Sequence, residues 1–343
     1  MTKIFCKQIY EYIEINHIGD VRMCCEHWCS GYTIGNILEN SLDEILAGEK
    51  YKTFAKQFEE QNFTYCDLNV CPLKVSCSDE EYDKKYNECT SRTSKILRIN
   101  FDSGCNLRCI FCREIFIKSD TRKVKKLLDK IREMLPYMDE NEWTISIDGS
   151  GEVFTSKHHL EFIKEVAENY PKIKFSIITN GVLASKEMFE KLGIEDRLNC
   201  VEISVHACRK STYDKMIIGG DFKLVKKNLE YISELKRAGK FHYLFVNFAV
   251  NSINYKEMEK FAKWIIELGG KPCFLPLVKV KQIRPTLYEK LNIADETHPR
   301  YNDFVRMLKK PIFSSEKVSI SQGYLDLKEK EEEKNIFKRI FKL

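Results

Sequence analysis

The sequence predicts an α/β protein with a small cysteine-rich region in front of it. Two observations carry this prediction. From residue 95 onward, short runs rich in β-branched and aromatic residues alternate with amphipathic helical runs, and most of the cysteines precede or open that pattern. Six β-α units in series favour a parallel sheet with helices outside it, as an open sheet or as a barrel.

The expected elements follow from the period of the apolar residues and from stop signals. The six strands are expected at 96–101, 143–148, 173–179, 200–206, 242–250 and 272–278. Helices are expected at roughly 121–136, 156–169, 185–192, 221–238 and 254–268. Pro136 and Pro171 follow helical runs, and Gly239 and Gly269 stand where helices end in a left-handed residue.

The distribution of cysteines predicts three parts of the chain. Of the 14 cysteines, most lie before residue 90, and the polar stretch NECTSRTSK then separates this region from the periodic one. We therefore expect a cysteine-rich domain at 1–92, stapled by metal because its core is small, and the α/β domain at 93–285. Residues 286–343 are expected to be a charged, mostly helical extension.

Composition excludes some classes of function. The chain has 343 residues, is 43% hydrophobic and 31% charged, and contains no apolar run long enough for a membrane span. A net charge of +5 fits a mixed solvated surface and predicts no nucleic-acid partner. Without an export signal at its start, the chain is expected in the cytoplasm, where thiols serve as ligands or redox groups rather than in disulfides.

The segment SGCNLRCIFC, residues 103–112, brings three thiols together as Cys105-x3-Cys109-x2-Cys112. It follows the first expected strand directly, so it lies at the edge of the sheet where barrels of this kind carry their sites. Cysteine thiolates hold iron–sulfur clusters. Three ligands leave one iron of a cubane open, and S-adenosylmethionine can chelate it. Zinc is the alternative, but it usually takes four protein ligands, and the next histidine is only His158.

The segment CNLRCIFC resembles the CxxxCxxC signature of radical S-adenosylmethionine enzymes, including the aromatic Phe111 before the third cysteine. Three further segments are similar in type and order: DGSGEVF after the second strand, TNG after the third and ISVHACRKSTYDKM around the fourth. The resemblance implies a partial (β/α)6 TIM-like barrel and a [4Fe-4S] cluster on the three cysteines. It also implies contacts to S-adenosylmethionine from Phe111, Ser150, Gly151, Glu152, Thr179, Asn180, Ser204 and either Arg209 or Lys210.

The N-terminal region resembles the SPASM domain, an auxiliary iron–sulfur module of many radical S-adenosylmethionine maturases. The likeness lies in the pair Cys6 and Cys24 around an expected hairpin at Gly19-Asp20, and in the segment IGNILENSLDEI. It implies an auxiliary iron–sulfur cluster bound by Cys6, Cys24, Cys66 and Cys71, with Cys25, Cys29 and Cys77 as further possible ligands. The module precedes the barrel here instead of following it. Zinc on the same ligands and disulfides are the alternatives.

The resemblance implies reductive cleavage of S-adenosylmethionine and abstraction of hydrogen from a substrate carbon. Relatives of this kind act on peptides and proteins, which is the reading we favour, or on carbohydrates and other small molecules. The outcome would be oxidation, a crosslink or epimerisation. A flavodoxin or ferredoxin would supply the electron. A third reading is a non-catalytic iron–sulfur carrier or scaffold.

Two side chains near the end of the fourth strand are open to more than one reading. Cys208 lies just beyond the strand, where a thiol would return a hydrogen atom to the substrate in an epimerase; the alternative is an ordinary strand-end residue. We interpret His206 as a packed strand residue rather than a base.

Overall fold

A computed structural model describes residues 3–24, 31–68, 71, 74–118, 120–147, 151–280 and 282–328. The chain divides into two compact units. Unit 1 comprises residues 1–104, 117–178 and 189–199, and unit 2 comprises 105–116, 179–188 and 200–343. Two short segments of unit 2, residues 105–116 and 179–188, therefore interrupt the sequence of unit 1, and the first of them contains the three cysteines.

Unit 1 is built on a mixed sheet with the strand order β4-β3-β2-β6-β8-β9. The strands are β2 (Tyr12–Asn16), β3 (Asp20–Arg22), β4 (Gly35–Asn36), β6 (Ile96–Asn100), β8 (Thr144–Ile147) and β9 (Lys174–Thr179). β2, β6, β8 and β9 pair in parallel, whereas β2, β3 and β4 pair antiparallel. Each of the four parallel strands has fully buried residues, among them Ile13, Leu97, Ile145 and Phe175.

The pairing of β2 with β6 links the N-terminal region to the α/β sheet. Ile13 stands opposite Leu97, and Ile15 stands opposite Ile99. The sheet is therefore continuous across the domain boundary expected at residue 92. The hairpin expected at Gly19 is present, because β2 and β3 pair antiparallel and Gly19 has a φ of +88° that favours glycine.

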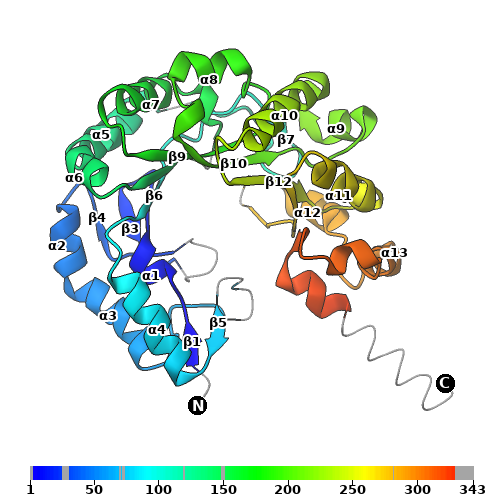
Figure 1. The fold of residues 1–343 in the computed structure, drawn as a ribbon. Coiled ribbons are helices and arrows are strands. Elements are labelled where there is room, and N and C mark those ends of the chain that lie inside the picture. The colour runs from blue at the N-terminus through cyan, green and yellow to red at the C-terminus, as the bar shows by residue number, and fades with distance from the viewer. Residues whose placement is uncertain are drawn as a thin grey trace. The chain divides into compact units, whose positions relative to one another are not determined.

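Helices pack on one side of this sheet, where Figure 1 shows α5, α6 and α7 outside β6, β8 and β9. They are α5 (Thr121–Arg132), α6 (Leu135–Glu140) and α7 (Lys157–Asn169), preceded by the short helix η1 (Val153–Thr155). The expectation of one helix over 121–136 was wrong at its end. The helix stops at Arg132, and Pro136 lies in the first turn of α6, where its missing N–H costs no hydrogen bond.

The remainder of the N-terminal region carries α1 (Gln8–Glu11), α2 (Leu42–Ala47), α3 (Glu49–Glu59) and α4 (Asp79–Thr90). A separate two-stranded sheet pairs β1 (Lys3–Phe5) with β5 (Val75–Cys77). Phe5, Cys77 and Cys89 form a small hydrophobic cluster there, with Tyr10 and Tyr82 packed against it. This region therefore has a modest core of its own.

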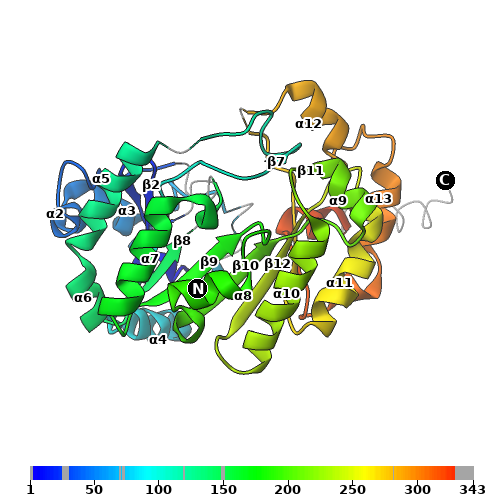
Figure 2. The ribbon, with the colours of Figure 1, turned by 90° about the horizontal axis from the view of Figure 1, so that it is seen from above.

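Unit 2 contains the parallel strands β10 (Leu198–Ser204), β12 (Tyr243–Ala249), β13 (Lys271–Leu275) and β14 (Ser319–Ile320). Figure 2 shows α10 (Phe222–Arg237) and α11 (Met258–Glu267) beside β10 and β12. Unit 2 also contains β7 (Arg108–Cys109), β11 (Ile217–Ile218), α9 (Lys210–Met216), α12 (Pro285–Leu291), α13 (Tyr301–Leu308), η3 (Tyr255–Glu257) and η4 (Pro311–Ser314). Of the other two elements, α8 (Lys186–Leu192) is shared by both units and η2 (Glu195–Arg197) belongs to unit 1.

All six expected strands are present, and the α/β class is confirmed. Gly239 and Gly269 follow α10 and α11 with a φ of +76° each, as the expected helix ends require. Over the described ranges, no helix is long and apolar enough to cross a membrane. The segment from residue 329 onward, which is part of the expected charged and mostly helical extension, lies outside the described residues.

Candidate functional site

The three cysteines at 105, 109 and 112 lie in a loop that is fixed by a short antiparallel pairing. Cys109 in β7 stands opposite Ile217 in β11, and Arg108 stands opposite Ile218. The next N–H, that of Ile110, donates to the carbonyl of Met216 at 2.9 Å. The middle thiol is therefore held by backbone hydrogen bonds to a segment about one hundred positions later in the sequence.

N–H donors lie beside the first and third sulfur atoms of this loop. The backbone N–H of Leu107 lies 3.4 Å from Cys105 Sγ, and Arg113 Nε lies 3.4 Å from Cys112 Sγ. Burial, and then the neighbouring Cys112 and Cys105 thiols, raise the pKa of Cys109. Three clustered thiolates need a cation, and donors aimed at sulfur are what tune iron–sulfur sites. The residues of the loop therefore fit a cubane with three cysteine ligands.

The expected glycine turn packs directly on the start of the cysteine loop. A Cβ at Gly151 would lie 2.3 Å from the carbonyl oxygen of Gly104 and 2.5 Å from that of Asp102. The N–H of Glu152 donates to the same Gly104 carbonyl at 2.8 Å. Only glycine fits this position, so the turn and the backbone at 102–104 are shaped against each other. Ser150, expected to contact the cofactor, lies outside the described residues.

Glu152 of this turn and Asp102 of the segment after β6 are buried carboxylates, at 2% and 4% exposure. Glu152 Oε1 accepts from the N–H of Phe154 at 3.3 Å. Asp102 Oδ1 accepts from the N–H of Gly104 at 2.8 Å and so shapes the backbone that precedes the first cysteine. The sequence analysis did not identify Asp102. Aspartates nevertheless often form turns in which their carboxylate accepts from the backbone N–H two residues later.

The segment Thr179-Asn180-Gly181 joins the cysteine loop through Asn180. Its Nδ2 donates to Asn106 Oδ1 at 2.8 Å and lies 3.8 Å from Cys105 Sγ. Its own Oδ1 accepts from the N–H of Val182 at 3.0 Å, while Thr179 Oγ1 accepts from Gly181 at 3.1 Å. These local bonds orient the amide toward the first cysteine.

Ser204 and His206 lie at the end of β10 and just beyond it, and Phe111 of the cysteine loop packs on His206. Ser204 is the last residue of the strand and stands opposite Asn247. His206 has a φ of +62°, and its Nδ1 accepts from the N–H of Ala249 at 2.9 Å. Burial lowers the pKa of His206 to about 4, so the ring is neutral. Phe111 packs edge-to-face on that ring, with centroids 5.1 Å apart.

The loop after β10 is held by Glu257, a buried residue that the sequence reading missed. Its carboxylate accepts from the backbone N–H of Cys208 and from the hydroxyl of Thr212, and it lies 3.6 Å from Arg209 Nε. Lys210 pairs with Asp214. The contacts expected from Arg209 and Lys210 to the cofactor remain predictions.

The N-terminal cysteines are partly exposed at Cys6, Cys24, Cys66 and Cys71. Burial raises the pKa of Cys6 to about 11, and the nearby Cys71 thiol adds to the shift. Cys77 instead packs in the hydrophobic cluster with Phe5. Across the described ranges, no three His, Cys, Asp or Glu side chains converge as a single metal ion requires. Cys25 and Cys29 lie outside the described residues.

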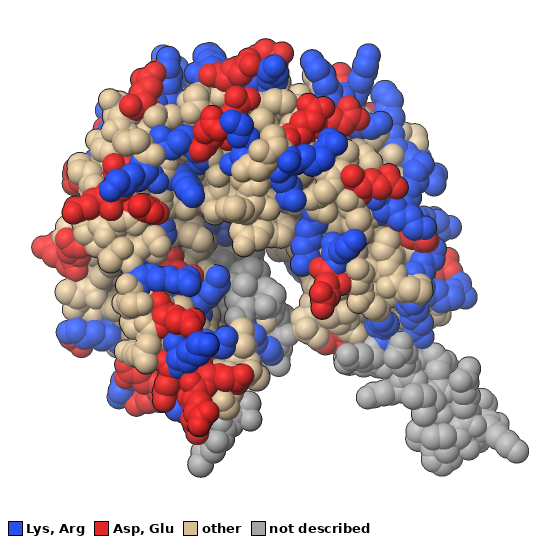
Figure 3. All heavy atoms as spheres, in the orientation of Figure 1, with Lys and Arg blue, Asp and Glu red and all other residues tan. Residues whose placement is uncertain are grey.

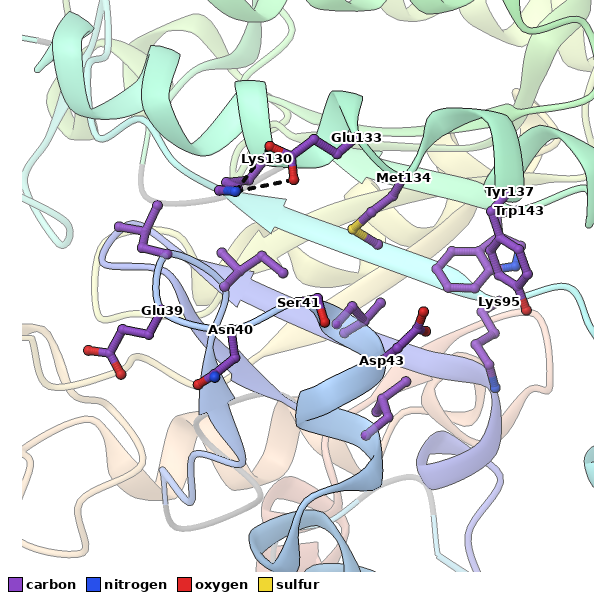
Figure 4. Close-up of a pocket in the computed structure, with 14 residues that line it drawn as sticks. Glu39, Asn40, Ser41, Asp43, Lys95, Lys130, Glu133, Met134, Tyr137 and Trp143 are labelled. Carbon is purple, nitrogen blue, oxygen red and sulfur yellow. Dashed lines mark hydrogen bonds and ion pairs between the residues drawn. The ribbon is translucent and has the colours of Figure 1, made fainter.

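A separate pocket of about 410 Å³ lies in unit 1. Figure 4 shows it between the start of α2, with Ser41 and Asp43, and the helices that carry Lys130, Glu133 and Tyr137. Trp143 lies at one end of it, and Lys130 pairs with Glu133. No residue expected at the sequence level to bind a cofactor or a metal lines this pocket.

Two family models match the chain. The model of the Radical SAM superfamily matches residues 99–265. The SPASM model, an iron-sulfur cluster-binding domain, matches residues 6–72. The first match contains the cysteine loop, Gly151, Asn180 and the end of β10; the second contains the four expected auxiliary ligands. Both resemblances inferred from the sequence are confirmed.

Individual relatives are distant. The chain is 30% identical over 194 residues to a GTP 3',8-cyclase of Alkaliphilus metalliredigens. The alignment covers 55% of this chain and 58% of that protein. It is 24% identical over 277 residues to the FeMo cofactor biosynthesis protein NifB of Methanocaldococcus infernus, covering 70% and 87%. The chain spans about half the length of several curated relatives that it matches.

Among solved structures, native anSMEcpe with bound AdoMet and Cp18Cys peptide is similar at 19% identity and a TM-score of 0.42, covering 66% of this chain and 63% of that one. A likeness at this level does not bear on the substrate. The family matches carry the fold class, a partial (β/α)6 TIM-like barrel, and the cofactors, a [4Fe-4S] cluster with S-adenosylmethionine and auxiliary iron–sulfur. Residues 99–265 therefore belong to the radical S-adenosylmethionine superfamily, and residues 6–72 in front of them form a SPASM domain.

Proposed function

We propose that this protein cleaves S-adenosylmethionine reductively and abstracts hydrogen from a carbon atom of a peptide or protein substrate. The observation that carries the proposal is the cysteine loop, in which Cys105, Cys109 and Cys112 are partly exposed and N–H donors lie beside the first and third sulfur atoms. When bound there, the cluster with S-adenosylmethionine supplies a 5′-deoxyadenosyl radical.

The protein's own residues hold and orient the backbone around the three cysteines. Gly151 lets the turn at 151–152 lie against Gly104, and Asn180 ties the third strand's end to the cysteine loop. Phe111, which directly precedes the third cysteine, packs edge-to-face on the neutral ring of His206. Rigid positioning of this kind is how a protein keeps a reactive species in line with its substrate and away from water.

The auxiliary cluster is proposed on Cys6, Cys24, Cys66 and Cys71, supported by the SPASM match and by the proximity of Cys6 to Cys71. A centre at these residues would accept the substrate electron after hydrogen abstraction, so oxidation or a crosslink is the favoured outcome. The burial of Cys77 argues for a packing role for that residue instead.

The SPASM domain is the feature that supports a peptide or protein substrate, since relatives with this module often modify such chains. The same chemistry on a carbohydrate or other small molecule is the alternative. Cys208 remains a candidate hydrogen donor. Burial, followed by Glu257, raises the pKa of its thiol to about 12, so the S–H bond that a donor needs is kept at neutral pH.

The test is formation of 5′-deoxyadenosine under strictly anaerobic conditions with dithionite as reductant. The reconstituted protein should form it, and Cys105→Ala should not. Iron, sulfide and zinc per chain are measured in the wild-type protein and in the variant in which Cys105, Cys109 and Cys112 are all replaced by alanine. About eight irons falling to about four indicates two cubanes. A wild-type protein that retains its clusters and makes no 5′-deoxyadenosine would be an electron carrier, and the proposal would fail.

The proposed cluster chemistry also has consequences for location and partners. Partly exposed clusters react with oxygen, so we place the protein in a reducing cytoplasm. The electron is expected from a flavodoxin or ferredoxin.

A further inference from the structure

Two large apolar side chains stand exposed just beyond the third cysteine. Ile115 is 70% exposed and Phe116 is 52% exposed, and Ile115 has the highest exposed fraction of any large hydrophobic residue in the described ranges. They follow Cys112 by three and four positions. Exposed apolar side chains beside a functional loop mark an interaction surface more often than scattered single ones do. No role described above uses either residue.

Phe116 is fixed to the frame of the cysteine loop. Its ring atoms Cζ and Cε1 lie 3.5 and 3.6 Å from where a Cβ of Gly219 would be, and the carbonyl of Asn106 lies 3.2 Å from the same point. Gly219 directly follows β11, the strand that pairs with Cys109. The exposed ring therefore has a fixed position beside the turn at Gly219.

Two arginines hold the same segment from the side. The backbone N–H and the Nε of Arg284 both lie 2.9 Å from Glu114 Oε1, and Nη1 of Arg108 donates to the Glu114 carbonyl at 3.0 Å. One guanidinium group thus binds the carboxylate of Glu114 and the other its backbone carbonyl, next to the apolar pair. This surface segment has a fixed shape and a positive surplus of charge.

The charge of the whole of unit 2 has the same sign. Its residues carry a formal net charge of +11 and those of unit 1 carry −6, which together give the +5 of the chain. Figure 3 shows Lys and Arg side chains gathered over the part of unit 2 that carries α11 and α13. Such a field attracts an acidic macromolecule and speeds its encounter with this unit.

We propose that Ile115, Phe116, Arg108 and Arg284 form the docking surface for an acidic one-electron carrier protein. The inference rests on the proposed function and adds the place where the electron enters. The carrier would lose one electron, and the cluster that the three cysteines would hold would gain it; no atom or proton would be transferred. An apolar centre with a charged rim suits a small, short-lived electron-transfer complex, which needs fast association more than a large interface.

The test compares two reductants on the holoprotein. Reduced flavodoxin is the protein probe, dithionite is the small-molecule probe, and the rate of cluster reduction is followed anaerobically by absorbance. Binding of flavodoxin is measured separately at low and high ionic strength. The variants are the double substitution I115S/F116S and Arg284→Ala. Tyr243→Ser, at a side chain 56% exposed in the same unit, is the matched control.

We expect I115S/F116S to lower flavodoxin affinity and the flavodoxin-driven rate by about tenfold or more, as loss of a central apolar anchor does. Arg284→Ala should weaken binding at low salt and have little effect at high salt. Dithionite-driven reduction and 5′-deoxyadenosine formation should be unchanged, as should every property of Tyr243→Ser.

Three results would overturn the docking role. They are an unchanged flavodoxin rate in I115S/F116S, an equal loss with dithionite, and a raised substrate KM with normal flavodoxin binding, which would assign the surface to the substrate. Failure of the proposed function looks different, because the wild-type protein would then make no 5′-deoxyadenosine even with dithionite.

Discussion

The carboxylate of Glu257 accepts a hydrogen bond from the backbone N–H of Cys208, with 2.8 Å between the nitrogen and Oε2. Glu257 is 3% exposed and lies at the end of η3, just before α11, whereas Cys208 follows β10. One buried carboxylate therefore fixes the loop that carries the candidate hydrogen donor. It also raises the pKa of the Cys208 thiol beyond the effect of burial.

Replacing Glu257 by Gln should make Cys208 more reactive toward alkylation at pH 8. The substitution removes the negative charge that disfavours the thiolate, and the thiolate fraction rises roughly tenfold for each unit by which the pKa falls. Iodoacetamide labelling followed by mass spectrometry of the Cys208 peptide measures the rate. Glu267→Gln, at the exposed last residue of α11, is the control. An unchanged rate at Cys208 would mean that burial alone sets its pKa.

Replacing Gly151 by Ala should destabilise the fold around the cysteine loop. The new Cβ would meet two backbone oxygens closer than 3 Å, and backbone cannot move aside as a flexible side chain can. We expect a loss of about 1–3 kcal/mol, measured as a lower urea midpoint. Gly323→Ala is the control, since nothing lies within 4 Å of its added Cβ. Equal midpoints for the two variants would show that the close approach at Gly151 is relaxed in solution.

Replacing Asn180 by Ala should weaken retention of the cluster at the three cysteines. The variant loses the amide that donates to Asn106 and approaches Cys105 Sγ, and loss of such a supporting donor costs about 10- to 100-fold in affinity or activity. Iron release to a chelator, followed by absorbance, gives the measurement. Asn169→Ala is the control, because Asn169 only donates to a carbonyl on an exposed helix. Matching release rates in the two variants would remove Asn180 from the site.

His159 predicts how stability depends on pH. The ring is 2% exposed, and neither nitrogen has a hydrogen-bond partner in the described part of the chain. Burial lowers its pKa from 6.5 to about 4; Asp102 opposes this shift and His158 adds to it. Between these values the unfolded chain binds a proton that the folded protein does not. Stability is therefore present above pH 6.5 and lost as the pH falls toward 4, by roughly 3 kcal/mol at most.

Replacing His159 by Leu should flatten that pH dependence, because the unfolded state then has one proton fewer to bind. At pH 7 the variant should be as stable as the wild type or more so, since an unpaired buried polar group is removed. Urea unfolding at several pH values between 7 and 4 measures both effects. Asn169→Leu, at an exposed position without a titratable side chain, should keep the wild-type slope. A His159→Leu protein that loses stability with pH as steeply as the wild type would contradict the assignment.

Local spacing in the sequence was enough to identify the family and the central loop. Three cysteines in eight positions, placed directly after a strand, indicate a cluster-binding loop whatever packs around it. The short chain between them keeps the three thiols close together without any help from the rest of the fold. The strand periodicity likewise predicted β6, β8, β9, β10, β12 and β13, since alternation of buried residues depends only on neighbours along the chain.

Contacts between distant segments were decided only by the tertiary structure. Nothing local shows that β2 pairs with β6, that Glu257 closes the loop at Cys208, or that Arg284 holds Glu114. Burial is equally non-local: Cys77 has the spacing of a ligand and lies in a hydrophobic cluster. The order of residues thus determined which chemistry the chain carries. The packing of segments far apart in sequence decided which side chains hold that chemistry in place, because hydrogen-bond partners are selected by the fold as a whole.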